Sequence, residues 1–189
     1  MTKKIKIGIT GLPGAGKTHA LRKVVEMLEV EGIKVGGMIT DAIEEKGKKV
    51  GFMVQDLLTK EEGVLARIDM DSEVRFLEYG IDMEALDGIG VAAINRSTME
   101  ADVIVIDEVG KLEVESKNFV EAVKDALEAD KPLLLTLHKK SRNPLLQDIR
   151  RRDDVRILEV TPINKNILPY KIIPLIKEEL VNKPNRDAY

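Results

Sequence analysis

Short apolar runs alternate along the chain with longer amphipathic stretches. The apolar runs predict strands at Ile5–Thr10, Lys34–Thr40, Lys49–Val54, Val103–Ile106, Leu133–Leu137 and Val155–Val160. The amphipathic stretches predict helices at Lys17–Glu31, Asp82–Glu100, Lys117–Ala129, Pro144–Arg152 and Asn164–Leu180. The last of these must begin late or kink, because it contains Pro169 and Pro174. Strands that alternate with helices predict an α/β fold with a mainly parallel sheet between two layers of helices.

One pair of predicted strands departs from this alternation. The charged stretch Glu44–Lys48 contains Gly47 and separates two strands without an intervening helix. Such a stretch predicts a hairpin turn, and we expect an antiparallel hairpin inserted at about residues 39–58. Residues 56–81 give no clear pattern. We find no repeat or long linker, and we expect a single domain over residues 1–180 with a flexible tail over residues 181–189.

Composition excludes several classes of site. The chain has 189 residues and no cysteine, so disulfides and thiolate metal sites are excluded. It has two histidines, His19 and His138, which disfavours a multi-histidine metal site. The net charge of −3 gives no general bias toward nucleic acid. No apolar run reaches the ~18 residues of a membrane span. We therefore expect a cytoplasmic protein without a membrane partner.

A glycine-rich segment follows the first predicted strand and precedes the first predicted helix. It matches the phosphate-loop pattern G-x-x-x-x-G-K-[ST] over Gly11, Leu12, Pro13, Gly14, Ala15, Gly16, Lys17 and Thr18. The glycines allow backbone N–H groups to wrap a phosphate, and the helix N-terminus favours negative charge. Lys17 is expected to reach the β- and γ-phosphates, and the Thr18 hydroxyl is expected to bind Mg²⁺. The segment predicts a nucleotide site.

A second motif combines a buried strand with two carboxylates, over Val103, Ile104, Val105, Ile106, Asp107, Glu108, Val109 and Gly110. We expect Asp107 to hold Mg²⁺ and Glu108 to polarise the water that attacks the γ-phosphorus. Asp107–Gly110 also fits the D-x-x-G pattern of switch GTPases. The guanine-reading N-K-x-D pattern is missing, however, because Asn164-Lys165-Asn166 is followed by Ile167.

Three blocks together carry a resemblance to a known family. The loop GLPGAGKT, the block VIVIDEVGKLEV and the stretch NPLLQDIRRR followed by VTPIN resemble P-loop nucleoside-triphosphatases described from thermophiles, whose relatives include the human cancer-related nucleoside-triphosphatase. The resemblance spans roughly residues 5–180. It implies a RecA-like fold whose sheet is extended by a hairpin. It also implies slow Mg²⁺-dependent hydrolysis of ATP, GTP and other triphosphates, with nucleotide contacts at Gly11–Thr18 and Val103–Gly110.

The chain departs from the family pattern at four positions: His19, Asn143, Ile163 and Lys165. A basic cluster over residues 139–156 contains Arg142, our first choice for a residue that stabilises transition-state charge. The same cluster fits a solvated helix face or, less well, an RNA-binding patch. His138 is a candidate for orienting water.

Three further assignments concern residues near the two motifs. Lys111 fits either a phosphate contact or an ion pair with Glu113, and we favour the ion pair. Thr40 and Asp41 are candidates for a supporting role at the site, because they end the second predicted strand.

The residues support a nucleoside-triphosphate phosphohydrolase with Lys17 and Glu108 as catalytic residues. Two alternatives stay open. A small-molecule kinase would need an acceptor pocket, which we place at residues 60–81. A nucleotide-gated module would instead bind a protein or RNA partner.

Overall fold

The structure is a computed structural model that describes residues 4–181. Its strands are β1 (Lys6–Gly11), β2 (Val35–Glu45), β3 (Lys48–Asp56), β4 (Glu62–Arg67), β5 (Arg75–Phe76), β6 (Tyr79–Ile81), β7 (Val103–Val109), β8 (Leu133–His138) and β9 (Val155–Glu159). Its helices are α1 (Lys17–Val30), α2 (Met83–Ala85), α3 (Ala92–Glu100), α4 (Lys117–Glu128), α5 (Pro144–Arg151) and α6 (Leu168–Val181), with a π-helical turn η1 (Leu86–Val91) and a 3₁₀ turn η2 (Glu113–Glu115). The predicted flexible tail lies outside the described residues, apart from Val181.

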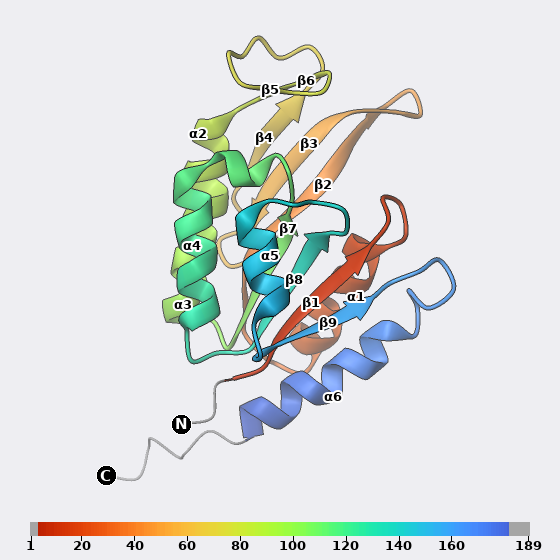
Figure 1. Ribbon diagram of the computed structural model, residues 1–189, viewed down its shortest axis with the longest axis vertical. Coiled ribbons are helices and arrows are strands. Elements are labelled where there is room, and N and C mark those ends of the chain that lie inside the picture. Colours follow the sequence, from red (N-terminus) through yellow and green to blue (C-terminus); the bar gives the residue numbers. More distant parts are fainter. Residues whose placement is uncertain (1–3, 182–189) are drawn as a thin grey trace.

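All strands belong to one sheet with the order β5-β6-β4-β3-β2-β7-β8-β1-β9. The strands from β2 to β9 in this order pair in parallel (Figure 1). The strand β8 lies between β1 and β7, so the strand that precedes the phosphate loop is not adjacent to the strand that carries Asp107. The carboxyl ends of these three strands meet at one edge of the sheet, where open α/β sheets bind ligands.

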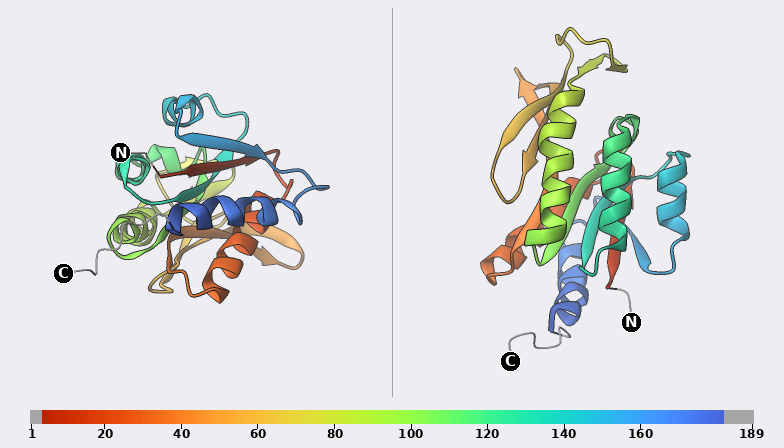
Figure 2. Two further views of the ribbon diagram at one scale, coloured as in Figure 1. Left: turned by 90° about the horizontal axis from the view of Figure 1, so that it is seen from below. Right: turned by 90° about the vertical axis from the view of Figure 1, so that its left-hand side faces the viewer.

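Helices cover both faces of the sheet (Figure 2). Buried side chains of α1 and α6 pack with Val103 and Val105 on one face. Those of α3, α4 and α5 pack with Ile104 and Ile106 on the other. Successive residues of β7 therefore point into different layers of the core, as expected for a strand buried on both faces. The predicted α/β fold, a mainly parallel sheet between layers of helices, is confirmed.

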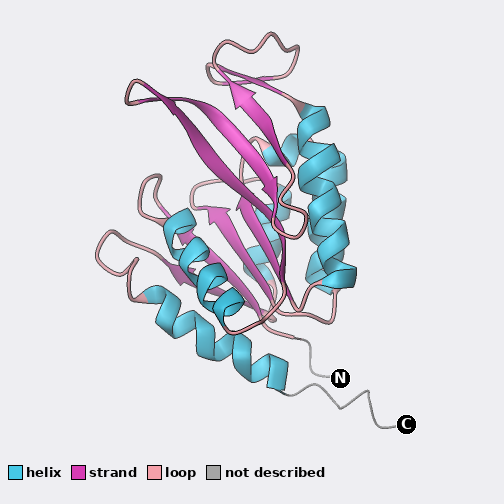
Figure 3. Cartoon of the chain, turned by 180° about the vertical axis from the view of Figure 1, so that it is seen from behind, coloured by secondary structure: helices cyan, strands magenta, loops and turns pink. Residues whose placement is uncertain are grey.

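The remaining strands form an antiparallel extension beside β2 (Figure 3). The hairpin between β2 and β3 closes through Lys46 and Gly47, which have φ values of 50° and 75°. Two positive φ angles are typical of the tight turn that matches the twist of a hairpin. The chain then adds β4, β6 and β5, for which the sequence pattern gave no prediction. The extension is thus larger than the predicted hairpin.

Two predicted helices differ in detail from the observed ones. The predicted helix Asp82–Glu100 begins as expected, with the Asp82 carboxylate accepting from the N–H of Ala85, but it contains the π-helical turn η1. The last helix begins late, at Leu168, and contains Pro174. Within residues 4–181, no helix is long and apolar enough to cross a membrane.

Candidate active site

The phosphate loop connects the buried strand β1 with α1. Gly14 and Gly16 have φ values of 77° and 108°, which side chains rarely tolerate. Gly16 is also the N-cap residue of α1 and supplies no side-chain acceptor to the first turn. The first-turn N–H groups of α1 therefore remain available to an anion, and the helix dipole favours negative charge there.

Lys17 lies inside the loop that it follows. Its side chain is buried, and Nζ donates a hydrogen bond of 3.1 Å to the carbonyl oxygen of Gly11. This bond holds the ammonium group across the loop, where it would meet a bound phosphate. Within the protein, the carbonyl oxygen of Gly11 is the hydrogen-bond acceptor for this ammonium group.

Asp107 forms the second half of the site. It is fully buried at the end of β7, where the pairing of β7 with β8 shifts register between Ile106 and Val109. Asp107 Oδ2 accepts a hydrogen bond of 2.9 Å from Thr18 Oγ1, and Asp107 Oδ1 accepts one of 2.5 Å from Thr136 Oγ1. Two predicted metal-binding residues, 89 positions apart in the sequence, are thus brought into contact.

Burial and neighbouring charges set the protonation of the two adjacent carboxylates. Burial raises the pKa of Asp107 to about 6, against the opposing effect of its hydrogen bond with Thr136. Burial also raises the pKa of Glu108, and the positive charges of Lys17 and Lys49 offset part of this rise. Lys49 comes from β3, so the hairpin contributes a cation that acts on Glu108.

The donors at this edge suit a small, hard cation. A threonine hydroxyl and a carboxylate in contact are the oxygen ligands that Mg²⁺ prefers, with waters and phosphate oxygens completing the octahedron. Among residues 4–181, no cluster of three or more His, Cys, Asp or Glu side chains forms a self-sufficient metal site. The arrangement therefore fits a cation that binds together with a nucleotide.

Thr136 is a site residue that the sequence reading missed. It is fully buried in β8, and its neighbours Leu135 and Leu137 are buried as well. In the sequence it reads as an ordinary strand residue in an apolar run. Only the position of β8 beside β7 reveals that its hydroxyl holds Asp107.

His138, at the end of β8, is paired in register with Gly11 at the start of the phosphate loop. Its Nδ1 is buried without a hydrogen-bond partner among the described residues, and burial lowers its pKa. His138 therefore lies beside the phosphate loop. Its suggested role in orienting water stays a hypothesis.

Asp41, a second candidate at the site, pairs with Arg22 of α1. Arg22 lies one turn beyond Thr18 in α1, and its charge acts on Asp107. The ion pair thus joins the hairpin to the phosphate-loop helix. The expected ion pair of Lys111 with Glu113 is wrong: no ion pair joins them among residues 4–181, where Lys111 is exposed and Glu113 is buried.

Part of the basic cluster is engaged in structural contacts, through Lys139, Arg150 and Arg152. Arg150 donates hydrogen bonds to the carbonyl oxygens of His138, Lys139 and Ser141, which fixes the loop after β8. Arg152 pairs with Asp154 and Glu128 at the opposite edge of the sheet. Arg142 is exposed, and no hydrogen bond or ion pair joins it to another residue in the described part of the chain.

The loop between β9 and α6 packs over the phosphate loop. The stem of Lys165 lies against Gly16, where a Cβ atom would approach Lys165 Cδ to 2.9 Å. His19 Nε2 and Asn166 Oδ1 lie 2.9 Å apart, in hydrogen-bond contact. Ile163 is 89% exposed, and Asn143 caps α5 by accepting from the N–H of Leu145. Three of the four positions that depart from the family pattern therefore lie in this loop or at its contacts with the phosphate-loop region.

A cavity of about 310 Å³ lies between α1 and the hairpin. Its lining combines four charged side chains, one amide and three aliphatic side chains: Arg22, Val25, Glu26, Glu29, Ile39, Gln55, Leu57 and Lys60. Only Lys60 belongs to the segment where we expected an acceptor pocket. The cavity therefore differs from the pocket that the kinase alternative predicts.

Comparison with known proteins identifies the family of the chain. A protein-family model described as NTPase matches residues 6–173, which includes the phosphate loop, β7 and the loop after β9. The chain belongs to this NTPase family. Members with similar sequences are the nucleoside-triphosphatases THEP1 of Picrophilus torridus, 43% identical over 93% of this chain and 97% of that protein, and of Thermofilum pendens, 44% identical over 85% and 89%.

Solved structures of the NTPase family share the fold. The crystal structure of THEP1 from Aquifex aeolicus superimposes with a TM-score of 0.82 at 27% identity, covering 92% of this chain and 99% of that one. The solution structure of a human cancer-related nucleoside triphosphatase gives 0.78 at 29% identity, covering 94% and 98%. The resemblance identified from the motifs is confirmed, and the protein is a nucleoside-triphosphatase.

Proposed function

We propose that this nucleoside-triphosphatase hydrolyses ATP, GTP and other nucleoside triphosphates to diphosphate and phosphate, slowly and with Mg²⁺. The observation that carries the proposal is the contact between Thr18 and Asp107, 2.9 Å, beside Lys17 and Glu108. Mg²⁺ held by these two oxygens would neutralise phosphate charge. We assign the nucleotide contacts to Gly11–Thr18 and Val103–Gly110.

Each side chain has a separate task in the proposed reaction. Lys17 and the first-turn N–H groups of α1 bind the phosphates and stabilise the negative charge that develops on them. Glu108 accepts the proton of the attacking water. Glu108 is half-buried, so its side chain is only partly shielded from solvent.

The proposal includes little selectivity among the nucleotide bases. The loop over the phosphate loop offers the lysine stem of Lys165, the Asn166–His19 contact and the exposed side chain of Ile163, and it has Ile167 where a guanine-reading aspartate would stand. None of these side chains imposes one donor–acceptor pattern. A cytoplasmic location is also a prediction. Nucleic acid is a disfavoured partner that the basic cluster leaves open, because Arg150 and Arg152 are held by contacts within the protein whereas Arg142 is exposed.

The test compares the wild type with Glu108→Gln, using phosphate release from the Mg²⁺ complexes of ATP, GTP, CTP and UTP. We expect the wild type to hydrolyse all four, and the variant to bind ADP normally but to lose ~100-fold or more in turnover. Glu115→Gln serves as the matched control, because Glu115 is an exposed glutamate in the same segment. Omitting Mg²⁺ should abolish wild-type turnover.

Two outcomes would contradict the proposal. Equal phosphate release by the wild type and Glu108→Gln would remove the assigned role of Glu108. Nucleotide binding without phosphate release, followed by turnover when a small hydroxyl compound is added, would instead establish the kinase alternative.

A further inference from the structure

Glu113 is a buried carboxyl group that the proposed reaction does not use. It opens the 3₁₀ turn η2, five residues after Glu108, and only 8% of its surface is exposed. Within residues 4–181 no lysine or arginine forms an ion pair with it. A buried carboxyl group without a cation is costly, so its position calls for a physical reason.

The side chains of Glu113 and Glu108 converge on Gly110. A Cβ atom at Gly110 would lie 2.8 Å from Glu113 Oε2 and 3.0 Å from Glu108 Oε1. Both carboxyl groups thus occupy the space that a side chain at Gly110 would fill. A glycine at this position leaves room for both carboxyl groups.

The turn between the two glutamates is held by its own backbone. The N–H of Val114 donates to the carbonyl oxygen of Gly110 at 3.3 Å, and the N–H of Ser116 donates to that of Glu113 at 3.1 Å. Ser116 in turn caps α4 by accepting from the N–H of Phe119. Glu113 is therefore fixed to a helix that packs in the core.

The electrostatic surroundings favour a proton on Glu113. Burial, followed by the charges of Glu108 and Asp107, raises the pKa of Glu113 to about 8, and the backbone N–H groups of Glu113 and Gly110 offset part of this effect. Two carboxyl groups in close proximity do not both ionise readily. A pKa near 8 favours the neutral form of Glu113 at neutral pH, in which its carboxyl group has an O–H donor on the side of Gly110 where the Glu108 side chain also lies.

We propose that Glu113 is a positioning residue, whose neutral carboxyl group holds the Glu108 carboxylate in the orientation that accepts a proton from the attacking water. The proposal rests on the role of Glu108 proposed above. It assigns a function to the last residue of the segment Asp107–Glu113, which otherwise only closes a turn. Glu113 acts through Glu108 and does not touch the nucleotide.

The experiment compares Glu113→Gln with Glu113→Met in the full chain. Glutamine retains an N–H donor of the same reach, so we expect a kcat within roughly threefold of the wild type. Methionine fills the same space without a donor, so we expect kcat to fall roughly 10-fold or more while KM and ADP affinity stay unchanged. Glu115→Met, an exposed change in the same turn, is the control, and thermal unfolding reports whether each variant is folded.

A second variant tests the geometry without removing either carboxyl group. Gly110→Ala places a methyl group against both, so kcat should fall while ADP still binds. Loss of activity in Glu113→Gln as large as in Glu113→Met would overturn the proposal, because it would mean that an ionised carboxylate is required. Unchanged kcat in both Glu113→Met and Gly110→Ala would also overturn it.

Glu108→Gln, measured in parallel, separates the two proposals. Full activity of that variant would refute the role of Glu108 as the base and, with it, the positioning role of Glu113. An inactive Glu108→Gln combined with fully active Glu113→Met and Gly110→Ala removes the positioning role alone.

Discussion

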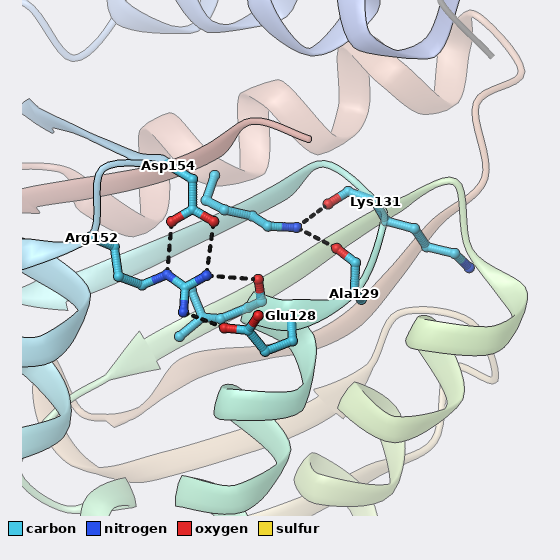
Figure 4. Close-up of polar contacts among 7 residues, drawn as sticks. Glu128, Ala129, Lys131, Arg152 and Asp154 are labelled. Atoms are coloured by element: carbon cyan, nitrogen blue, oxygen red, sulfur yellow. Dashed lines mark hydrogen bonds and ion pairs between the residues drawn. The ribbon is translucent and has the colours of Figure 1, made fainter. Parts of the chain in front are cut away.

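Lys6 carries a buried ammonium group at the edge of the sheet opposite the phosphate loop. Lys6 is 1% exposed, and its Nζ donates hydrogen bonds of 2.6 Å to the carbonyl oxygens of Ala129 and Lys131. These two partners are labelled in Figure 4. Burial lowers the pKa of Lys6 from 10.5 to about 8, although the neighbouring charge of Asp154 raises it. Arg152 binds the same Asp154 and thereby limits its effect on Lys6.

The lowered pKa makes stability depend on pH in a definite direction. Between about pH 8 and pH 10.5 the unfolded chain binds the Lys6 proton more tightly than the folded chain, so the free energy of unfolding rises with pH. The full shift corresponds to about 3 kcal/mol, at about 1.4 kcal/mol per pKa unit. Roughly 2 kcal/mol of this gain should be present between about pH 7 and pH 9.5.

The variant Lys6→Met should lose this pH dependence. At pH 7 two effects oppose each other, because the variant avoids burying a charge but leaves two carbonyl groups without a donor. The informative quantity is therefore the pH dependence, measured by urea unfolding of the wild type and the variant across this range. Lys124→Met, an exposed change on α4, should follow the wild type. Parallel curves for the wild type and Lys6→Met would refute the reasoning.

Two further predictions concern the site and the fold. Thr136→Val removes the 2.5 Å hydrogen bond to Asp107 and should weaken Mg²⁺ binding to the ADP-loaded protein roughly 10-fold in calorimetric titration, whereas Thr136→Ser should restore it. Equal affinities would contradict the assigned contact. Gly37→Ala would bring a methyl group to 1.9 Å from the carbonyl oxygen of Val105 at a φ of 120°, and should cost more than about 3 kcal/mol in denaturant unfolding. Gly47→Ala, at a φ of 75° in open space, should cost only about 1 kcal/mol, and similar losses at both positions would contradict the packing argument.

The parts of the structure that the sequence predicted are those where local chemistry leaves few choices. The phosphate loop needs its glycines at fixed positions, and the turn at Lys46–Gly47 needs positive φ angles. Both can therefore be predicted from the sequence without tertiary information. The buried strand β7 can be predicted from the sequence because the side chains on both of its faces are apolar over Val103–Ile106. In each case the residues next to one another in the sequence determine the outcome.

The antiparallel extension shows the opposite situation. β5 and β6 have two and three residues, too few for a period of two to become visible. Their pairing with β4 depends on residues that lie far away in the sequence. Likewise, η1 interrupts a regular helical pattern at Gly88 and Gly90, and the sulfur of Met38 lies 3.0 Å from the position of a Cβ at Gly90. Close packing of the helix on the sheet is visible only once the fold is assembled.

The same distinction explains which site residues the sequence could reveal. Lys17, Thr18, Asp107 and Glu108 belong to motifs, which is expected of residues that contact the phosphate and the cation directly in the proposed reaction. Thr136 contacts only the protein: its role depends on β8 lying beside β7, and a threonine in an apolar strand has several ordinary explanations. The role of such a supporting residue depends on its tertiary contacts, so it can be recognised only from the strand order and from the neighbouring side chains.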